Sequence, residues 1–304
     1  MQETTYWQGF WRLADPKISL ASFAGMVMAA CFAAADGGLH GWWLAFTVFG
    51  IFCVEVAKNA SGELVDFDSG TDQAVRAENR SPFSGGKRVL VDGLLSQTQT
   101  RNIAVTFFVA AIVAGLTITL FRDSRVLGFG VFGMALAWSY HGAPLKLAYR
   151  GLGELAVAIA YGPLVVCGTY FVQVGSFSAP LIHGSMALGL LIAAFLWINE
   201  FPDYDADKAA GKNNLVVQLG CETASLVYVV LLTTGYIWLL LCANYYHAHG
   251  MLWGILGVVP AIFSAWRLMA SDGVTHAVIP AQAACLLSFI LMACGSGVGY
   301  WLSV

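Results

Sequence analysis

Residues 180–212 read PLIHGSMALGLLIAAFLWINEFPDYDADKAAGK, an apolar run that passes directly into a cluster of acids. Its first part, residues 180–197, contains no Asp, Glu, Lys or Arg. A helix needs about 20 mostly apolar residues to cross a lipid bilayer. The segment therefore predicts a membrane-spanning helix with acidic side chains at one membrane surface.

Similar apolar segments occur along the whole chain. The nine predicted spans are residues 18–35, 42–60, 102–121, 125–140, 153–174, 180–197, 223–245, 251–269 and 277–302. The chain is 58% hydrophobic and 11% charged, whereas soluble domains carry about 25% charged residues. We therefore expect an all-α integral membrane protein, a bundle of nine transmembrane helices that forms a single domain over residues 1–304.

The basic residues indicate how this bundle is oriented. If the N-terminus is cytoplasmic, that side receives 13 of the 15 Lys and Arg residues, and the other side receives only Arg122 and Arg125. This asymmetry follows the positive-inside rule. We expect a bacterial-type inner or plasma membrane, a cytoplasmic N-terminus, and cytoplasmic loops after the second, fourth, sixth and eighth spans. A cleaved signal peptide is the less favoured interpretation of the first apolar run, because many similar runs follow it.

Net charge and cysteine spacing exclude other classes. The formal net charge is −3 and no long basic cluster occurs, which argues against a nucleic-acid partner. The seven cysteines show no C-x-x-C spacing and most lie inside apolar runs. We interpret them as small apolar side chains rather than metal ligands or disulfides.

The second predicted span ends in an acidic motif, Asn-Ala-Ser-Gly-Glu-Leu-Val-Asp-Phe-Asp-Ser-Gly-Thr-Asp, at residues 59–72. If the helix continues through it, Asn59, Glu63 and Asp66 share one face. Asp68 and Asp72 repeat the same four-residue step.

The sixth predicted span ends in a near-copy at residues 199–212. There Asn199, Asp203 and Asp207 stand at i, i+4 and i+8, a spacing that predicts one row along the helix. Two rows of acids repel each other, and Mg²⁺ is bound in proteins through one or two carboxylates plus substrate phosphates. Solvated helix-capping acids are the alternative, but two near-copies at the same end of two spans disfavour it. The predicted metal-binding residues are Glu63, Asp66, Asp68, Asp72, Asp203 and Asp207.

Basic residues are interleaved with these acids. Lys and Arg beside Mg²⁺ suit a diphosphate leaving group, because they stabilise the negative charge that grows as the C–O bond breaks. Contact with phospholipid headgroups is the alternative for each basic residue, and Arg150 and Glu154 have the spacing of a helical ion pair. The predicted diphosphate-binding residues are Asn59, Arg76, Lys146, Arg150, Asn199 and Lys212.

Glu55 is a separate case, because it lies inside the second predicted span. An unpaired charge there is costly, and such residues usually face a cavity or a partner. Lys58 and Asn59 are the nearest candidate partners in the sequence. Its role stays open between a structural and a functional one.

The two motifs resemble those of the UbiA superfamily of intramembrane prenyltransferases, and within it the menaquinone branch that prenylates 1,4-dihydroxy-2-naphthoate. The first is similar to N-x-x-N-D-Y-x-D-x-x-x-G-x-D and the second to N-x-x-R-D-x-x-x-D-x-x-x-G-K. Residues 146–154 are similar to K-x-x-Y-R-G-L-G-E. The matching residues are Asn59, Asp66, Gly70, Asp72, Asn199, Asp203, Asp207, Gly211 and Lys212. Gly62, Glu63 and Pro202 depart from the branch pattern, which leaves the acceptor open.

The resemblance implies a central cavity capped by cytoplasmic loops, with Mg²⁺ as cofactor and a prenyl diphosphate and an aromatic quinone-precursor-like acceptor as substrates. The isoprenoid tail would extend into the bundle, and loss of diphosphate would give an allylic cation that the acceptor attacks. Aromatic π faces stabilise such cations, although aromatic residues at span ends are also common as interfacial anchors. The predicted catalytic residues are Asp66, Asp72, Tyr140, Asp203 and Asp207.

Three alternatives stay open at this point. A UbiA-like terpene cyclase needs the same motifs but no acceptor. The hypothesis of a transporter predicts charged residues deep in several spans, and only Glu55 is near such a depth. Haem prenylation occurs within the superfamily, but no residue in this sequence points to haem.

Overall fold

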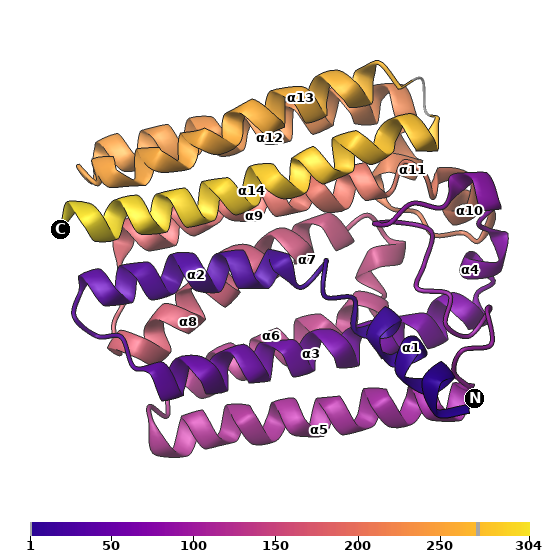
Figure 1. Ribbon diagram of the computed structural model, residues 1–304, viewed down its shortest axis with the longest axis horizontal. Coiled ribbons are helices and arrows are strands. Elements are labelled where there is room, and N and C mark those ends of the chain that lie inside the picture. Colours follow the sequence, from indigo (N-terminus) through magenta and orange to yellow (C-terminus); the bar gives the residue numbers. More distant parts are fainter. Residues whose placement is uncertain (1, 272–273) are drawn as a thin grey trace.

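The computed structural model describes residues 2–271 and 274–304, which form helices and connecting turns and contain no strand. Within these described ranges, seven helical segments are long and apolar enough to cross a membrane, and they run side by side in one bundle (Figure 1). They are α3 (Gly41–Asp68), α5 (Gln97–Phe121), the composite α7–η3–α8 (Gly153–Val174), α9 (Ala179–Asn199), α12 (Cys221–Tyr245), the composite η4–α13 (His249–Met269) and α14 (Thr275–Ser303).

Two further apolar helices, α2 (Leu20–Ala35) and α6 (Val126–His141), lie in the same bundle (Figure 1). Each has 16 residues and is therefore about 24 Å long, somewhat shorter than the roughly 30 Å hydrocarbon core of a bilayer. Every segment that hydropathy predicts as a span is thus helical in the structure. That all nine cross the membrane stays a prediction.

The outward faces of the bundle carry large apolar side chains. Trp42 is 83% exposed, and Leu120 and Val259 are each 75% exposed. Soluble proteins rarely expose extensive apolar surface, so these faces suit lipid contact. The inner faces of α2, α9, α12 and α14 pack into the largest buried apolar cluster.

The segment Gly153–Val174 bends in its middle. Gly162 has a non-helical ψ of −105° and precedes Pro163 in a five-residue π-helical turn, η3 (Ala160–Leu164), between α7 (Gly153–Ile159) and α8 (Val165–Val174). A Cβ atom on Gly162 would lie 2.6 Å from the carbonyl oxygen of Ser185 in α9. The glycine therefore allows α9 to approach the bend closely.

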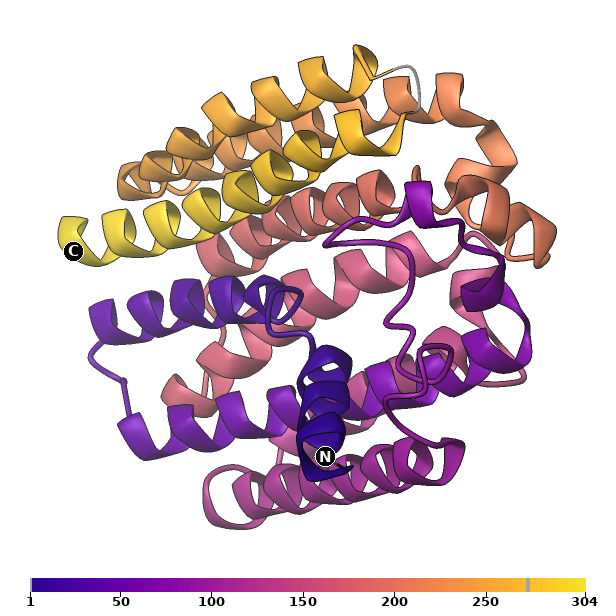
Figure 2. The same cartoon turned by 45° about the vertical axis from the view of Figure 1, so that its right-hand side comes forward.

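Short elements and long connections gather at one end of the bundle, on the right of Figure 1. The connection between α4 and α5 passes over this end beside α1 (Figure 2). The short elements are α1 (Gln2–Ala14), α4 (Thr71–Ala74), η1 (Ala77–Asn79), η2 (Leu147–Tyr149), α10 (Tyr204–Ala209) and α11 (Leu215–Leu219).

The two acidic motifs differ in backbone structure. Helix α3 runs without a break to Asp68, so the predicted helical continuation is confirmed for Asn59, Glu63 and Asp66, whereas Asp72 lies on the separate helix α4. Helix α9 ends at Asn199, and Asp203 stands before the separate helix α10. The prediction of one helical row through the second motif is therefore wrong. Pro202 accounts for the break, because proline lacks an N–H and disfavours helical conformation in the residue before it.

Candidate active site

A polar cavity of about 390 Å³ lies at the end of the bundle where the two motifs meet. Asp66 at the end of α3 and Asp203 before α10 both line it, although they are far apart in the sequence. The acids on its wall that were predicted to bind metal are Glu63, Asp66, Asp72, Asp203 and Asp207. The structure thus brings five of the six predicted metal ligands to one cavity.

In the first motif, neutral groups provide most of the hydrogen bonds. The Tyr149 hydroxyl donates to Asp66 Oδ1 at 2.7 Å, and His141 Nε2 lies 3.9 Å from Asp66 Oδ2. The backbone N–H of Leu90 donates to Glu63 Oε1 at 2.9 Å. The second carboxylate oxygen of Glu63 is buried and has no hydrogen-bond partner among the described residues.

Asp72, in α4, is the least neutralised acid of the first motif. Its side chain is 3% exposed, and its Oδ2 atom finds no hydrogen-bond partner in the described part of the chain. Arg88 donates to the backbone carbonyl of Asp72 rather than to its carboxylate. Burial, followed by the negative charges of Asp66 and Glu63, raises the pKa of Asp72 to about 8. A bound cation at this position would offset the repulsion.

In the second motif, charged and amide groups hold the acids. Lys212 Nζ lies 3.4 Å from Asp207 Oδ1, and the Asn214 side-chain amide donates to Asp207 Oδ2 at 2.8 Å. The backbone N–H of Gly85 donates to Asp203 Oδ2 at 3.0 Å. Burial and the charge of Asp207 raise the pKa of Asp203 to about 7.

Lys212 is the cation that the two motifs share. Burial alone would lower its pKa, but the negative charges of Asp207 and Asp66 outweigh burial and raise it well above the usual value. Its Nζ atom also lies 5.8 Å from the centroid of the Tyr149 ring. The structure therefore places Lys212 beside carboxylates of both motifs, and its predicted contact with diphosphate stays a prediction.

The two predicted asparagines also lie on the wall of the polar cavity. The Asn59 amide donates to the carbonyl oxygens of Leu13 and Ala14, at 3.2 and 3.4 Å, and so holds the end of α1 against α3. Asn199 Oδ1 is buried without a hydrogen-bond partner among residues 2–271 and 274–304. Asn199 is thus available to a bound ligand, whereas the Asn59 amide already has protein partners.

Four predicted residues are not on the wall of this cavity. Asp68, Arg76 and Arg150 are exposed, and Arg150 donates to the carbonyl oxygen of Pro144 at 3.1 Å. Lys146 has its Nζ atom 5.7 Å from the centroid of the Tyr149 ring. Their positions give no support to metal or diphosphate binding, and those roles stay predictions.

Lys58, His141 and Glu200 are among the wall residues that had no predicted role in the site. Each stands next to a predicted residue in the sequence, but only tertiary structure shows that they line the cavity. A Cβ atom on Gly62 would lie 2.6 Å from the His141 ring. Gly62, where the menaquinone branch has Asn, therefore makes room for this imidazole.

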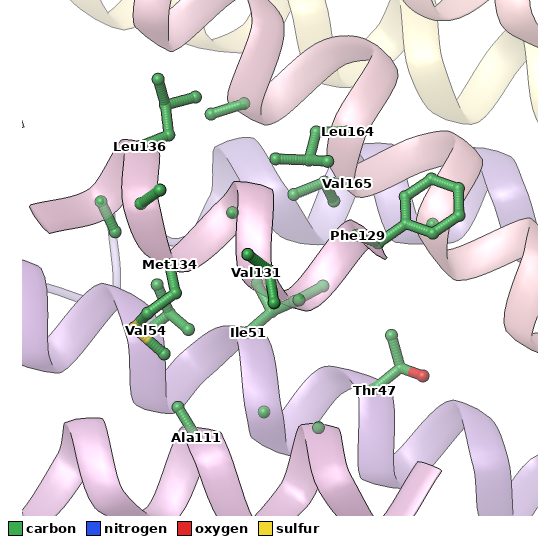
Figure 3. Close-up of a pocket in the computed structure, with 18 of the residues that line it drawn as sticks. Thr47, Ile51, Val54, Ala111, Phe129, Val131, Met134, Leu136, Leu164 and Val165 are labelled. Atoms are coloured by element: carbon green, nitrogen blue, oxygen red, sulfur yellow. The ribbon is translucent and has the colours of Figure 1, made fainter. Parts of the chain in front are cut away.

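A second, apolar cavity of about 750 Å³ lies deeper in the bundle, between α3, α5, α6 and the α7–η3–α8 segment. Figure 3 shows apolar side chains from these helices around it, among them Ile51, Val54, Val131, Met134 and Leu164. Lys58 and Tyr140 line both cavities, with Lys58 Nζ 5.3 Å from the Tyr140 ring centroid. The polar and apolar cavities therefore adjoin at these two residues.

The polar cavity suits a divalent cation that arrives together with an anionic ligand. Within the described ranges, no group of three or more His, Cys, Asp or Glu residues forms a ready-made metal site. Buried carboxylate oxygens without hydrogen-bond partners nevertheless occur on Glu63, Asp72 and Asp203. Oxygen ligands of this kind are those that Mg²⁺ takes, and Mg²⁺ usually completes its coordination with water and substrate phosphates.

The fold and the candidate site together define a helical membrane protein in which an acid-lined cavity adjoins an apolar cavity. The chain belongs to the UbiA prenyltransferase family, whose model matches residues 23–278. The predicted resemblance is therefore confirmed, and the protein is an integral membrane protein of a family of prenyltransferases.

Two relatives are similar over most of their length. The 2-carboxy-1,4-naphthoquinone phytyltransferase of Synechocystis sp. is 30% identical over 245 residues, which are 79% of this chain and 75% of that protein. The 1,4-dihydroxy-2-naphthoate octaprenyltransferase of Bacillus subtilis is 28% identical over 241 residues, 78% of this chain and 74% of that protein.

A solved structure has the same fold. It is a UbiA homolog from Archaeoglobus fulgidus described as bound to GPP and Mg²⁺. The TM-score is 0.59 at 15% sequence identity, and the match covers 93% of this chain and 99% of that chain. At this identity the likeness establishes the UbiA-like fold.

Proposed function

We propose that this protein transfers a prenyl group from a Mg²⁺-complexed prenyl diphosphate to an aromatic, quinone-precursor-like acceptor. One observation carries the proposal: the acid-lined cavity and the apolar cavity adjoin at Lys58 and Tyr140. A prenyl diphosphate has the same two parts, an anionic head and an apolar tail. The naphthalene acceptors named for the two relatives indicate the acceptor class.

In this proposal the cavity acids hold the metal and Lys212 and Asn199 contact the diphosphate. Bound Mg²⁺ would supply charge neutralisation and make the diphosphate a better leaving group. Lys212 lies beside acids of both motifs, so its ammonium group can contact a diphosphate bound between them. The hydrogen bond between Asn214 and Asp207 does not depend on Lys212. The residues that would hold the metal are Glu63, Asp66, Asp72, Asp203 and Asp207.

The reaction begins where the two cavities adjoin. The allylic C–O bond breaks and its electron pair leaves on the diphosphate oxygen. The cation that remains lies beside Tyr140, whose ring can stabilise positive charge. An electron-rich ring carbon of the acceptor then forms the new C–C bond.

We also propose that α2 and α6 complete nine membrane crossings in one domain over residues 1–304. The N-terminus then lies in the cytoplasm, and the connections after α3, α6, α9 and α13 cap the active site on that side. The distribution of 13 basic residues against 2 supports this orientation.

The test uses purified protein in detergent with geranyl diphosphate, Mg²⁺ and 1,4-dihydroxy-2-naphthoate, and detects products by mass spectrometry. We expect a geranylated naphthalene product and release of diphosphate. The same incubation without acceptor tests the cyclase alternative, for which cyclic hydrocarbons are the expected products. Absence of prenylated product across a panel of aromatic acceptors and prenyl diphosphates would overturn the proposal.

A further inference from the structure

Glu55 is a buried acid without a role in the reaction proposed above. It lies in the membrane-spanning part of α3, is 6% exposed, and lines the apolar cavity. Ser19, Ser22 and Tyr161 place hydroxyl groups near its carboxyl group. Its Oε1 atom, however, has no hydrogen-bond partner among the residues that the structure describes. An ionisable group at such a position in a membrane protein is usually functional.

Lys58 lies one helical turn further along α3, on the same face as Glu55. The two charges are not joined in an ion pair within 4.0 Å in the described structure, where Lys58 instead lies over the Tyr140 ring. A carboxylate, an ammonium group and an aromatic ring thus surround the place where the cavities adjoin.

The proposed reaction requires the acceptor to bind where the two cavities adjoin. With the diphosphate among the acids and the tail in the apolar cavity, the allylic carbon lies between them, near Lys58 and Tyr140. The acceptor ring must reach this carbon. The acids of the two motifs lie in the polar cavity, where they would hold the metal and the diphosphate. Among the acids that the structure describes, Glu55 alone lines the apolar cavity.

We propose that Glu55 is the general base of the transfer and that Lys58 pairs with a carboxylate of the acceptor; this rests on the proposed function. Glu55 Oε1 accepts the proton of a ring hydroxyl. The O–H electron pair becomes the C=O bond of a dienone, and a ring π pair forms the C–C bond to the allylic carbon. The electron pair of the breaking C–O bond leaves on the diphosphate. The substituted carbon then loses a proton to the released diphosphate, or loses carbon dioxide, and the electron pair of the broken bond restores the aromatic ring. The dienone oxygen takes back the proton from Glu55, which returns as a carboxylate.

The first test compares Glu55→Gln with Glu222→Gln, using geranyl diphosphate, Mg²⁺ and 1,4-dihydroxy-2-naphthoate. Glu222 is exposed in the first turn of α12 and lines neither cavity, so its variant is the matched control. We expect Glu55→Gln to lower kcat by about 10²–10⁴-fold, the range of general-base catalysis. Binding of geranyl diphosphate with Mg²⁺ should change less than about twofold, and Glu55→Asp should recover part of kcat.

The second test removes the proton instead of the base. The two mono-O-methyl ethers of 1,4-dihydroxy-2-naphthoate serve as acceptors. On one of the two ethers, wild-type protein should lose about as much kcat as Glu55→Gln loses on the parent acceptor. The two losses should not add, so Glu55→Gln should have about the same kcat on that ether as on the parent acceptor. Additive losses, or wild-type kcat in Glu55→Gln, would overturn the assignment.

Lys58→Met tests the carboxylate contact. We expect KM for 1,4-dihydroxy-2-naphthoate to rise about tenfold or more, while KM for 1,4-dihydroxynaphthalene, which lacks the carboxylate, stays unchanged. Equal effects on both acceptors would overturn the role of Lys58. If Glu55→Gln also loses geranyl diphosphate binding, Glu55 is structural and the inference fails. Wild-type protein that prenylates none of these acceptors overturns the proposed function and the inference together.

Discussion

The two acidic motifs are near-copies in the sequence, but the structure builds them differently. The first lies on one continuous helix, α3, as far as Asp68, with Asp72 on the separate helix α4. Its acids take hydrogen bonds from neutral donors such as Tyr149 and the Leu90 N–H. The second crosses a helix break. Its Asp207 is held by Lys212 and by the Asn214 amide.

This difference separates two tasks within one cavity. The second motif carries its own counter-charge, so it can keep its shape before any ligand binds. Buried oxygens without hydrogen-bond partners in the described structure occur in both motifs, on Glu63 and Asp72 in the first and on Asp203 and Asp207 in the second. Among the described residues, however, no Lys or Arg lies within 4.0 Å of a carboxylate of the first motif. We therefore infer that the second motif is a preformed anchor and that the first depends more on the bound metal.

The largest effect is expected in the first motif, from Asp66→Ala. The variant removes a carboxylate that lies beside Lys212, His141 and Tyr149. We expect diphosphate release to fall by about 10³-fold or more, the scale on which loss of electrostatic stabilisation acts. Chelation of Mg²⁺ by EDTA should do the same to wild-type protein. Diphosphate release measures both effects.

Membrane insertion of Asp66→Ala is the control for this loss. Its yield in the membrane fraction and its helicity by circular dichroism should match those of wild-type protein, because Asp66 lies at the end of α3 and not in a packed core. Full turnover without added Mg²⁺, or in the variant, would count heavily against the metal-dependent mechanism.

A smaller loss is expected in the second motif, from Asp203→Ala. Asp207, Lys212 and Asn214 keep their contacts when Asp203 is removed, so part of the anchor persists. We expect about a 10²-fold loss of kcat, at the lower end of the effect of removing one electrostatic group from an active site, and partial recovery at high Mg²⁺. Titration of activity against Mg²⁺ measures both. A loss larger than that of Asp66→Ala would reverse the proposed asymmetry.

The sequence predicts the helices of this fold well because hydropathy is a local property. The predicted span 153–174 coincides with the observed segment Gly153–Val174, and the predicted span 42–60 lies within α3. The motif spacing also predicts that the acids meet. Sequence periodicity predicts a single helical row in the second motif, but Pro202 prevents it.

Other parts of the site depend on contacts that a sequence pattern does not carry. Lys146 and Arg150 belong to a recognisable motif, yet the chain turns so that they do not line the cavity. Lys58 and Glu200 line it without belonging to the matched positions. Which side of a loop faces the cavity is decided by packing between distant segments, so composition and spacing leave it open.

A third prediction concerns the connection that reaches over both motifs. Gly86 has a φ of +73°, and a Cβ atom added to it would overlap the Asp72 carboxylate. Gly93 has a φ of +66° with no heavy atom within 4 Å of such a Cβ. Both alanine variants should lose about 1–2 kcal/mol of unfolding free energy from backbone strain. Only Gly86→Ala should also raise the Mg²⁺ concentration needed for half-maximal activity, by about tenfold.

Gly93→Ala serves as the matched control for this prediction. Thermal unfolding in detergent reports the strain in both variants, and the Mg²⁺ titration reports the contact with Asp72. Equal Mg²⁺ requirements in the two variants would show that the connection does not set the position of Asp72, and the asymmetry between the motifs would then arise from α3 alone.

The smallest effect is expected from Asp68→Asn, in the same motif as Asp66 and only two residues away. Two residues correspond to about 200° around an α-helix, so Asp68 lies on the outer face of α3 while Asp66 lines the cavity. We expect kcat and the Mg²⁺ requirement to change less than about twofold, as for an exposed acid without a close partner. Comparison of this variant with Asp66→Ala separates the effect of where an acid lies from the effect of merely having an acid in the motif. A loss of more than about tenfold would mean that the end of α3 rearranges when Mg²⁺ binds and brings Asp68 to the metal, as the sequence pattern alone predicts.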